Sequence, residues 1–297
     1  MFMVMFTNDQ MEKMLECFGS DFLETLPEKL DTVAQKWQLD DLLFIEYYSV
    51  NCLFTCVSKH YGDCVLKVFG TSHEWYIDEI RALNESKGNL RYVQTYECDE
   101  ELGALLLERI FPGVTLKAEP SIDKRLSEFV RVWKNAHIEP REPFLFKTYL
   151  ESVEIAALKP WAIGEIPELR QAAKSMVAAC RSLYEIYPER LLLHGDLHGD
   201  NLLSNLRGEY TIVDPHGRIG PPICDLGRYI ANEYADAKVD EKASVIDYVT
   251  TQLSDVLGLP RDDVFQAFFV DITLMTCWDA EDGTADLAGV LLAQGMQ

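Results

Sequence analysis

The stretch His194-Gly195-Asp196-Leu197-His198-Gly199-Asp200-Asn201 is the densest cluster of reactive polar side chains in this 297-residue chain. Asn201 follows Asp196 by five positions, and Asp214 follows Asn201 by thirteen, after a hydrophobic segment. Phosphoryl transfer from a nucleotide needs a residue that orients a hydroxyl and oxygen ligands for Mg²⁺. Because Mg²⁺ prefers carboxylate and amide oxygens, the two aspartates and the asparagine supply all of these groups.

This spacing matches the H-R-D-x-x-x-x-N pattern of kinase catalytic loops, except that Gly195 replaces the arginine. Two other interpretations remain open: a polar turn that caps a helix, or a transition-metal site formed by His194, His198, Asp196 and Asp200. The glycines between the two histidines argue against a helix that would place both on one face. His198 is more typical of a hydrogen-bonding residue that stabilises a loop than of a metal ligand.

The sequence upstream of this loop predicts a sheet. Apolar residues at helical spacing first predict two helices over residues 8–38, broken at Gly19. Short segments rich in β-branched and aromatic residues then predict strands at 42–48, 52–58, 64–69, 92–97 and 104–109. A charged amphipathic helix at 75–84 lies between the third and fourth strands. The pattern indicates a five-stranded antiparallel sheet with one internal helix.

Beyond Ile110-Phe111-Pro112-Gly113 the hydrophobic period is almost entirely helical. Only residues 191–213 break this pattern, because short apolar pieces alternate there with polar turns. Helices are predicted at 122–136, 148–158, 169–187, 223–234, 242–257 and 264–275. We therefore predict an α+β fold with an N-terminal lobe at 1–109, a hinge at 110–115 and a larger, mostly helical C-terminal lobe at 116–297.

The net charge of the chain limits the kinds of partner that it can bind. The chain has 27 Lys and Arg and 49 Asp and Glu, so its formal net charge is −22. This charge repels nucleic-acid phosphates and anionic membranes. We therefore expect no nucleic-acid or membrane partner. Eight cysteines without a CxxC pair, no signal-peptide pattern and no apolar run of about 20 residues predict a cytoplasmic protein.

Several motifs together resemble the aminoglycoside phosphotransferase family, kinase-like enzymes that phosphorylate small molecules. The similarity is greatest to the branch that contains streptomycin 6-kinases and aminoglycoside/hydroxyurea resistance kinases. The motifs are Phe22-Leu23-x-x-Leu26-Pro27 with Trp37-Gln38-Leu39, Val65-Leu66-Lys67-Val68, Leu105-Leu106-Leu107-Glu108-Arg109 with Pro112-Gly113, the loop from His194 to Asn201, Asp214-Pro215 through Asp225-Leu226, and Trp278-x-x-Glu281-Asp282-Gly283.

The resemblance implies a role for each residue around the loop. Asp196 would orient or deprotonate the acceptor hydroxyl, and Asn201 and Asp214 would hold Mg²⁺ against the nucleotide phosphates. His194 and the carboxylate of Asp225 would support the catalytic loop. A plain helix N-cap remains an alternative for Asp225.

The resemblance also implies a nucleotide site for ATP in the N-terminal lobe. Lys67 would reach the α- and β-phosphates and pair with Glu79, which fits the spacing better than Glu74 does. The alternatives are a Lys67 that snorkels from a strand edge and a Glu79 that is a solvated helix charge. Backbone groups from Glu108 to Ile110 would contact adenine. The turn that begins at Ser49 has no glycine, so Ser49 or the nearby backbone would contact phosphate.

The C-terminal stretch suggests the acceptor. From Asp262 to Gln297 there are seven carboxylates and no Lys or Arg, which favours a cationic acceptor. Candidates for acceptor contact are Trp278, Asp279, Glu281 and Asp282. Packing in the core is the alternative for Trp278, and an ordinary solvated turn is the alternative for the three acids.

Taken together, these features predict a kinase-like enzyme that uses Mg²⁺ to transfer the γ-phosphoryl group of ATP to a hydroxyl of a small molecule. A streptomycin-like aminoglycoside is the favoured acceptor, with antibiotic resistance as the matching role. One alternative is a metabolic kinase that acts on an amino alcohol or a sugar. Another is a nucleotide-binding pseudokinase, which the glycine-free turn favours and the intact Asp196, Asn201 and Asp214 set opposes.

Overall fold

The computed structural model describes residues 6–46, 51–70, 73–159 and 166–296, and only the backbone of residues 73–75. The chain divides into two compact units, Met1–Gly113 with Asn205–Thr211 and Val114–Ser204 with Ile212–Gln297. This division falls inside the segment 110–115, for which we predicted a hinge. Residues 205–211 belong to the first unit, where Arg207 donates a hydrogen bond to the carbonyl of Leu90. We predicted instead that residues 116–297 form one uninterrupted C-terminal lobe.

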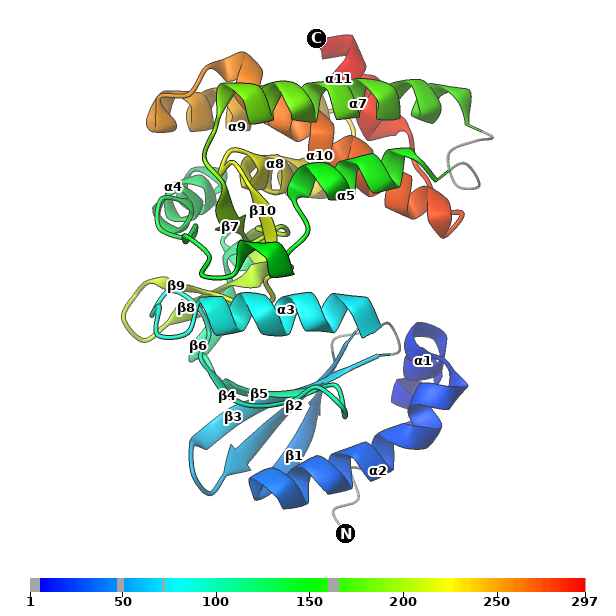
Figure 1. Ribbon diagram of the computed structural model, residues 1–297, viewed down its shortest axis with the longest axis vertical. Helices are drawn as coiled ribbons and strands as arrows, with labels where there is room; N and C mark the ends of the chain where they lie inside the picture. The colour runs from blue at the N-terminus through cyan, green and yellow to red at the C-terminus, as the bar shows by residue number, and fades with distance from the viewer. Residues whose placement is uncertain (1–5, 47–50, 71–72, 160–165, 297) are drawn as a thin grey trace. The chain divides into compact units, whose positions relative to one another are not determined.

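The first unit contains the predicted five-stranded antiparallel sheet, which is confirmed (Figure 1). Its strands are β1 (Leu39–Ile45), β2 (Asn51–Ser58), β3 (Gly62–Phe69), β4 (Thr95–Asp99) and β5 (Ala104–Glu108), in the order β1-β2-β3-β5-β4. Lys67 on the central strand pairs in register with Leu53 of β2 and Leu105 of β5. β4 begins later than predicted because the Gln94 side chain donates to the carbonyls of Asn89 and Tyr92 and holds this segment in a turn.

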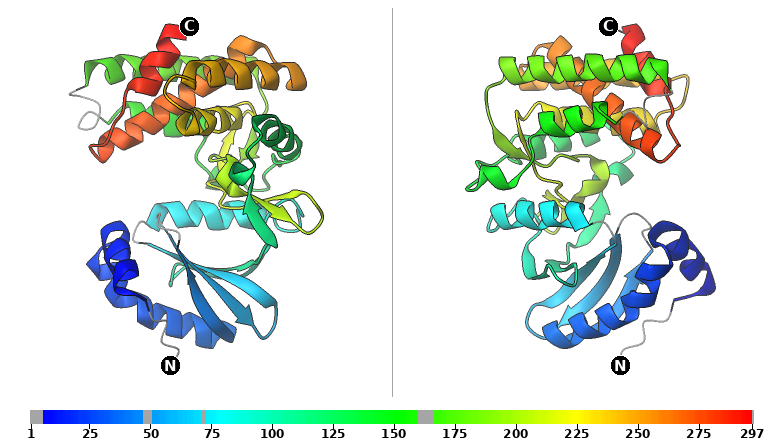
Figure 2. Two further views of the ribbon diagram at one scale, coloured as in Figure 1. Left: turned by 180° about the vertical axis from the view of Figure 1, so that it is seen from behind. Right: turned by 45° about the vertical axis from the view of Figure 1, so that its right-hand side comes forward.

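Helices cover both faces of this sheet. Figures 1 and 2 show α1 (Asn8–Phe18) and α2 (Ser20–Trp37) on one side and α3 (His73–Glu85) on the other. A capping box at Thr7 begins α1. The apolar positions of α2 recur at helical spacing, so one stripe of the helix is buried against the sheet. The residues in this core include Phe22, Leu26, Leu30, Val33 and Trp37 of α2 and Cys52, Phe54, Leu66 and Val68 of the strands.

The second unit is mostly helical and is built around α10. Its helices are α4 (Ile122–Trp133), α5 (Tyr149–Ala157), α7 (Pro167–Ile186), α8 (Cys224–Asp236), α9 (Lys242–Leu257), α10 (Arg261–Glu281) and α11 (Ala288–Met296). α10 packs against α5, α7, α8, α9 and α11. It extends six residues beyond the end that we predicted at Met275, so Trp278, Asp279 and Glu281 lie in a helix and not in a turn.

Short strands frame the polar loop of this unit. β7 (Leu191–Leu193) pairs antiparallel with β10 (Arg218–Gly220), and the loop leaves β7 directly. β6 (Pro112–Thr115), β8 (Leu202–Asn205) and β9 (Tyr210–Ile212) form a third sheet in the order β6-β8-β9. The described part of the chain also contains the short 3₁₀ turns η1 (Leu116–Ala118), η2 (Pro143–Leu145) and η3 (Gly199–Asn201). None of the helices in the described ranges is long and apolar enough to cross a bilayer.

Candidate active site

A buried carboxylate holds the start of the loop that follows β7. Asp225 is 1% exposed, and its two oxygens accept hydrogen bonds from the backbone N–H of His194 (3.0 Å) and of Gly195 (2.9 Å). His137 Nε2 lies 3.0 Å from the same carboxylate. Burial alone would raise the pKa of Asp225, but the hydrogen bonds and the nearby histidines lower it. Asp225 lies inside the first turn of α8, whose N-cap is Ile223, so it is not the N-cap that we considered.

His194 ties the loop to the strand that precedes Asp214. Its Nδ1 accepts from the N–H of Asp196 (3.1 Å), and its Nε2 therefore carries the proton and donates to the carbonyl of Val213 (2.9 Å). The ring is fully buried, and burial lowers the pKa of His194, which favours this neutral form. Because both ring nitrogens bond to the backbone, His194 is not available as a metal ligand. Across the described ranges, no group of three or more His, Cys, Asp or Glu has the geometry to hold a metal ion.

His198 likewise makes hydrogen bonds within the loop. Its Nδ1 accepts from the N–H of Asp200 (3.3 Å), which places the proton on Nε2, 3.4 Å from Oδ2 of Asp196. It is the N-cap of η3. This arrangement is the loop-stabilising role that we favoured over metal binding.

The side chain of Asn201 is held by Asp196, five residues earlier in the loop. Its Nδ2 donates to the backbone carbonyl of Asp196 (2.9 Å) and to Oδ2 of the same residue (3.2 Å). Because these two neighbours are oxygen acceptors, the amide nitrogen faces them, and it also lies 3.3 Å from Nε2 of His198; the amide oxygen is left for a cation. Asn201 is buried, 7% exposed, so this orientation is fixed by its surroundings.

Asp214 is brought to the loop through its neighbour Val213. The Val213 N–H donates to the carbonyl of Asn201 (3.0 Å), while its carbonyl accepts from His194. Asp214 itself has a φ of 59°, in the left-handed region that residues other than glycine rarely adopt. Backbone strain of this kind is concentrated at functional sites. Asp196, Asn201 and Asp214 therefore belong to one hydrogen-bonded assembly in the second unit.

An arginine that the sequence analysis did not select contacts Asp196. Arg228 of α8 lies with Nη1 3.1 Å from Oδ1 of Asp196 and Nε 2.9 Å from Oδ2 of Asp271, and it is 8% exposed. Burial alone would raise the pKa of Asp196, but Arg228, His216 and His198 outweigh it and hold that pKa well below its usual value. The available signal was a lone arginine after Gly227 in an otherwise apolar part of a predicted helix.

Lys67 and Glu79 form a buried ion pair in the first unit. The Nζ of Lys67 lies 2.8 Å from Oε1 and 2.7 Å from Oε2 of Glu79, and each residue is 4% exposed. A snorkelling lysine and a solvated glutamate are therefore both excluded. Burial of two charges costs free energy that a well-aligned pair only partly regains, so such pairs are often kept for function. The side chain of Glu74 and the whole of Ser49 lie outside the described residues.

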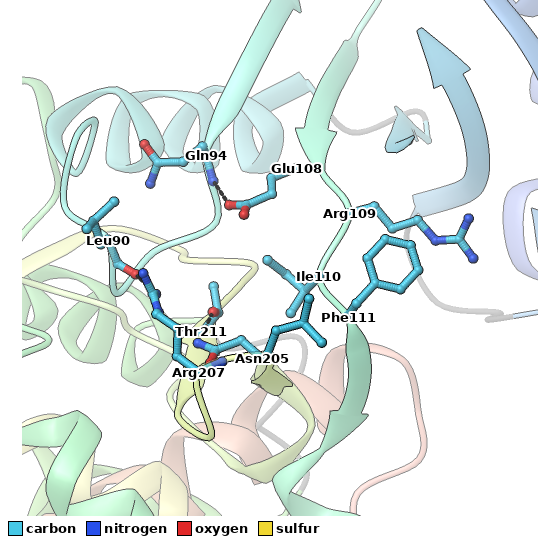
Figure 3. A pocket seen from close by; sticks show the side chains of 10 residues that line it. Leu90, Gln94, Glu108, Arg109, Ile110, Phe111, Asn205, Arg207 and Thr211 are labelled. Carbon is cyan, nitrogen blue, oxygen red and sulfur yellow. Dashed lines mark hydrogen bonds between the residues drawn. The ribbon is translucent and has the colours of Figure 1, made fainter. Parts of the chain in front are cut away.

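The end of β5 lines a pocket of about 250 Å³ within the first unit, shown in Figure 3. Glu108 donates its N–H to the carbonyl of Gln94 (2.8 Å) and accepts from the N–H of Gln94 through Oε2 (3.3 Å). The guanidinium of Arg109 lies over the ring of Phe111, 4.8 Å from its centroid. Among the described residues, nothing accepts a hydrogen bond from the N–H of Ile110, so this edge of the chain can still bind a planar polar ligand.

The four residues considered for acceptor contact lie at the end of α10. Glu281 forms an ion pair with Lys159 at 2.6 Å, so its charge is already compensated. The ring of Trp278 lies 5.5 Å from the guanidinium of Arg228. Asp279 is exposed as a residue. Partial burial of its carboxyl raises the pKa of Asp279, and the negative charge of the nearby Asp282 raises it further. Asp282 is the C-cap.

The C-terminal stretch is less openly acidic than the sequence suggested. Asp271 is 1% exposed and lies against Arg228, and Asp263 accepts from the hydroxyl of Tyr187 at 2.7 Å. With Glu281 these make three carboxylates that have partners inside the unit. These three carboxylates therefore do not add free negative charge for a cationic acceptor, because they face partners on neighbouring elements.

Comparison with known proteins identifies the family. Residues 57–283 match the sequence profile of the aminoglycoside/hydroxyurea antibiotic resistance kinases. The chain belongs to this family. A streptomycin 6-kinase of Streptomyces griseus is 26% identical over 200 residues, 66% of this chain, and one of Streptomyces glaucescens is 31% identical over 115 residues, 37% of this chain. The chain spans 64% and 37% of the lengths of these two relatives, less than two thirds of either.

Solved structures show the same fold for this resistance-kinase family member. The choline kinase LicA from Streptococcus pneumoniae aligns with a TM-score of 0.63 at 18% identity, over 93% of this chain and 97% of that structure. A thermostable mutant of the aminoglycoside phosphotransferase APH(4)-Ia, crystallised with ADP and hygromycin B, aligns with a TM-score of 0.62 at 14% identity, over 89% and 95%. These similarities establish the protein-kinase-like fold that we predicted.

Proposed function

We propose that this protein transfers the γ-phosphoryl group of ATP to a hydroxyl of a small molecule. The observation that carries the proposal is the assembly of Asp196, Asn201 and Asp214, in which one amide fixes one carboxylate and a strained aspartate follows the adjacent strand. Membership of a kinase family supports it. So does the similarity in fold to a phosphotransferase that was crystallised with ADP.

In this proposal the first unit contributes the residues that bind ATP. Glu79 holds the ammonium of Lys67 in place, so that a single cation is ready for the α- and β-phosphates. Backbone groups from Glu108 to Ile110 would bind adenine, and the N–H of Ile110 is a donor without another partner among the described residues. Ser49 stays a prediction for phosphate contact.

The second unit would contribute the ligands for Mg²⁺. The amide oxygen of Asn201 and the carboxylate of Asp214 are the hard oxygen donors that this ion prefers. Bound Mg²⁺ would neutralise charge on the nucleotide phosphates. The Nδ2 bonds of Asn201 keep its oxygen available, so the donor set fits the ion.

Asp196 would receive the acceptor hydroxyl. Its lowered pKa keeps the carboxylate ionised and able to accept a hydrogen bond, and also makes it a weak base. Because the transition state of phosphoryl transfer is loose, orientation of the hydroxyl matters more than removal of its proton. Asp225 and His194 would act on Asp196 through the backbone of the loop.

Streptomycin is the acceptor that we propose. Both curated relatives described above carry the name streptomycin 6-kinase. A net charge of −22, together with exposed Asp279 and Asp282 in the same unit as Asp196, suits a cationic acceptor. The matching biological role is antibiotic resistance.

The test is transfer of phosphate from Mg·ATP to streptomycin, measured by mass spectrometry of the product. Asp196→Asn should reduce the rate by roughly 10²- to 10⁴-fold. Asp200→Asn is the matched control, since it makes the same change in the same loop at a partly exposed residue that pairs with Lys117, and we expect a loss below about fivefold. Undiminished transfer by the Asp196 variant would overturn the assigned mechanism.

The same assay separates the alternatives. Choline, ethanolamine and a panel of sugars are offered in parallel with streptomycin. Turnover of one of these and none of the aminoglycoside would indicate a metabolic kinase. Thermal stabilisation by ATP without product from any acceptor would indicate a nucleotide-binding pseudokinase.

A further inference from the structure

We propose that Arg228 is a positioning residue that fixes the orientation of the Asp196 carboxylate, an inference that rests on the proposed function. The two oxygens of Asp196 are held from different elements. Oδ1 lies 3.1 Å from Nη1 of Arg228 on α8, and Oδ2 accepts from Nδ2 of Asn201 in the loop. A carboxylate held at both oxygens cannot rotate freely, so its remaining lone pairs point in defined directions toward an incoming hydroxyl.

Arg228 is itself anchored from behind. Its Nε lies 2.9 Å from Oδ2 of Asp271, and Oδ1 of Asp271 accepts from the hydroxyl of Tyr149 on α5 at 3.1 Å. Asp271 is 1% exposed and Tyr149 is 4% exposed. The contact of Nε with Oδ2 is a close ion pair without hydrogen-bond geometry, so the buried charge of Asp271 holds the planar guanidinium in place by electrostatic attraction. Three helices, α5, α8 and α10, thus determine the position of one oxygen of Asp196.

The backbone beside Arg228 is built for this contact. A Cβ added at Gly227 would lie 2.3 Å from the carbonyl oxygen of Ala267 and 2.9 Å from Cβ of Asp271. Both distances are below any real contact, so only glycine allows α8 to approach α10 this closely. The close approach places Arg228 within reach of Asp271.

The end of α10 completes the surroundings of the guanidinium. Trp278 lies seven residues, or about two turns, after Asp271 and therefore on the same side of the helix. Its ring centroid lies 5.5 Å from Cζ of Arg228, a cation–π distance. Trp278 thus contacts the residue that positions Asp196, which gives it a role that does not require contact with the acceptor.

A purely structural role for Arg228 makes a different prediction. Arg228 lies between Asp271, which is buried, and Asp196, whose side chain is 16% exposed, and removal of the cation from a buried ion pair destabilises a fold. If Arg228 only supported the fold, substitutions would lower stability and leave the folded enzyme with its normal kcat. If it positions Asp196, kcat falls while the KM for ATP, whose proposed contacts lie on other residues, stays the same.

The experiment compares Arg228→Met, Arg228→Lys and the double variant Arg228→Met/Asp271→Asn with the wild type. The double variant removes the carboxylate that would otherwise be buried without its cation, so it guards against misfolding. With Mg·ATP and streptomycin, we expect kcat to fall by roughly 10²-fold in both Met variants. Arg228→Lys should recover part of this loss, and the KM for ATP should change little in all three.

Arg125→Met is the matched control. Arg125 of α4 forms a partly buried ion pair with Glu233 of α8, and its Nε donates to Glu233 at 2.8 Å. Its removal should lower the unfolding midpoint and leave kcat unchanged. An equal loss of kcat in this control would show that the effect of Arg228 is structural and would overturn the proposal.

Crystal structures of the wild type and the double variant give a readout that needs no acceptor. We expect the Asp196 carboxylate to leave its wild-type rotamer when Arg228 is absent. An unchanged Asp196 would overturn the positioning role whether or not any acceptor is phosphorylated. Failure of the wild type to phosphorylate streptomycin would instead count against the proposed function, so the two failures are distinguishable.

Discussion

The two units each bury a group of charges, and the two groups differ in composition. In the first unit, Lys67 and Glu79 form a closed pair of one cation and one carboxylate, with both carboxylate oxygens within 2.8 Å of the ammonium. In the second unit, one cation, Arg228, lies between two carboxylates, Asp196 and Asp271. The formal charges of Lys67 and Glu79 cancel, whereas the single charge of Arg228 faces two carboxylates, and burial raises the pKa of one of them, Asp271.

This difference corresponds to what each group would meet during the proposed reaction. A lysine that is paired beforehand is held ready, and phosphate oxygens then add to the interactions that it already makes. A carboxylate that shares its cation remains under-compensated, and it can still accept a hydrogen bond from an incoming hydroxyl. The closed pair is therefore suited to binding, and the shared arginine is suited to orientation.

Among substitutions outside the catalytic loop, the largest effect should come from breaking the closed pair. Lys67→Met removes the cation proposed for the phosphates, and with it the ammonium that both oxygens of the buried Glu79 contact. We expect kcat/KM for ATP to fall by roughly 10²- to 10³-fold, the loss typical of a positioned charge at a phosphoryl group. Steady-state kinetics with varied ATP measures this directly.

Glu79→Gln tests whether Lys67 requires the charge of Glu79 or only a hydrogen-bond acceptor at that position. The amide oxygen of glutamine can still accept from Lys67, so the orientation of the lysine is partly preserved. We expect a smaller loss than for Lys67→Met. A loss in Glu79→Gln as large as that in Lys67→Met would mean that the charge of Glu79, and not only its position, is required.

A second prediction concerns the contact that makes the shared arginine possible. Gly227→Ala places a methyl group against the backbone of Ala267, and overpacking of this kind costs about 1 to 3 kcal/mol or more. Separation of α8 from α10 should also weaken the contact of Arg228 with Asp271, so kcat should fall as well. Urea unfolding and the streptomycin assay measure the two effects.

Gly295→Ala on α11 is the control for this substitution. Nothing lies within 4 Å of a Cβ added at Gly295, and alanine favours helix by up to about 1 kcal/mol. We expect unchanged or slightly greater stability and normal kcat. Equal behaviour of the two glycine variants would contradict the close approach of α8 and α10.

The closed pair could be predicted from sequence, whereas the shared arginine could not. Lys67 lies in an apolar strand and Glu79 in the helix that follows, so their meeting depends on two adjacent elements. Arg228 meets Asp196 and Asp271 only because two helices distant in sequence approach at one glycine. Helical periodicity places Arg228 on a face of α8 but does not identify what that face contacts.

The fold itself was largely predictable, with two instructive differences. All five predicted strands are present, but Tyr92 and Val93 are buried outside β4, which was predicted to contain them, because Gln94 donates to the carbonyl of Tyr92 and holds the backbone that precedes the strand. α10 is buried on nearly every side from Val264 to Cys277 and so lacks an amphipathic pattern that would mark its end. The sequence pattern therefore predicts an end at Met275, six residues before the helix ends at Glu281.

A third prediction tests the anchor of the catalytic loop. Asp225→Asn keeps the shape of the side chain but removes the charge that accepts from two backbone amides. We expect a loss of about 1.5 to 3 kcal/mol in the free energy of unfolding at neutral pH, the range for hydrogen bonds to a charged group. Because the pKa of Asp225 is lowered in the folded protein, its contribution is complete above the ordinary value of 3.8 and is lost as the pH falls through the folded value.

The difference between wild type and Asp225→Asn should therefore shrink as the pH falls below about 4. Urea unfolding of both proteins at a series of pH values measures it, and other acidic groups cancel in the difference. If the difference in unfolding free energy between the two proteins is constant with pH, the charge of the Asp225 carboxylate contributes nothing to stability. In that case the loop would be held by shape alone.

The smallest effect should come from another pair of a lysine and a carboxylate, in which the lysine lies at the surface. Lys36 lies 2.7 Å from Asp99, and its side chain is 54% exposed, against 5% for Lys67. Water and salt screen the charge of an exposed lysine. Lys36→Met should therefore shift the urea midpoint only within experimental error at physiological ionic strength. Any small shift at low salt should disappear as salt is added. Lys67→Met should be destabilising at every salt concentration, because the charge that it leaves behind is buried. A salt dependence shared by both variants would show that the pair of Lys67 and Glu79 is open to solvent, and would remove the distinction between a closed pair and an ordinary surface ion pair.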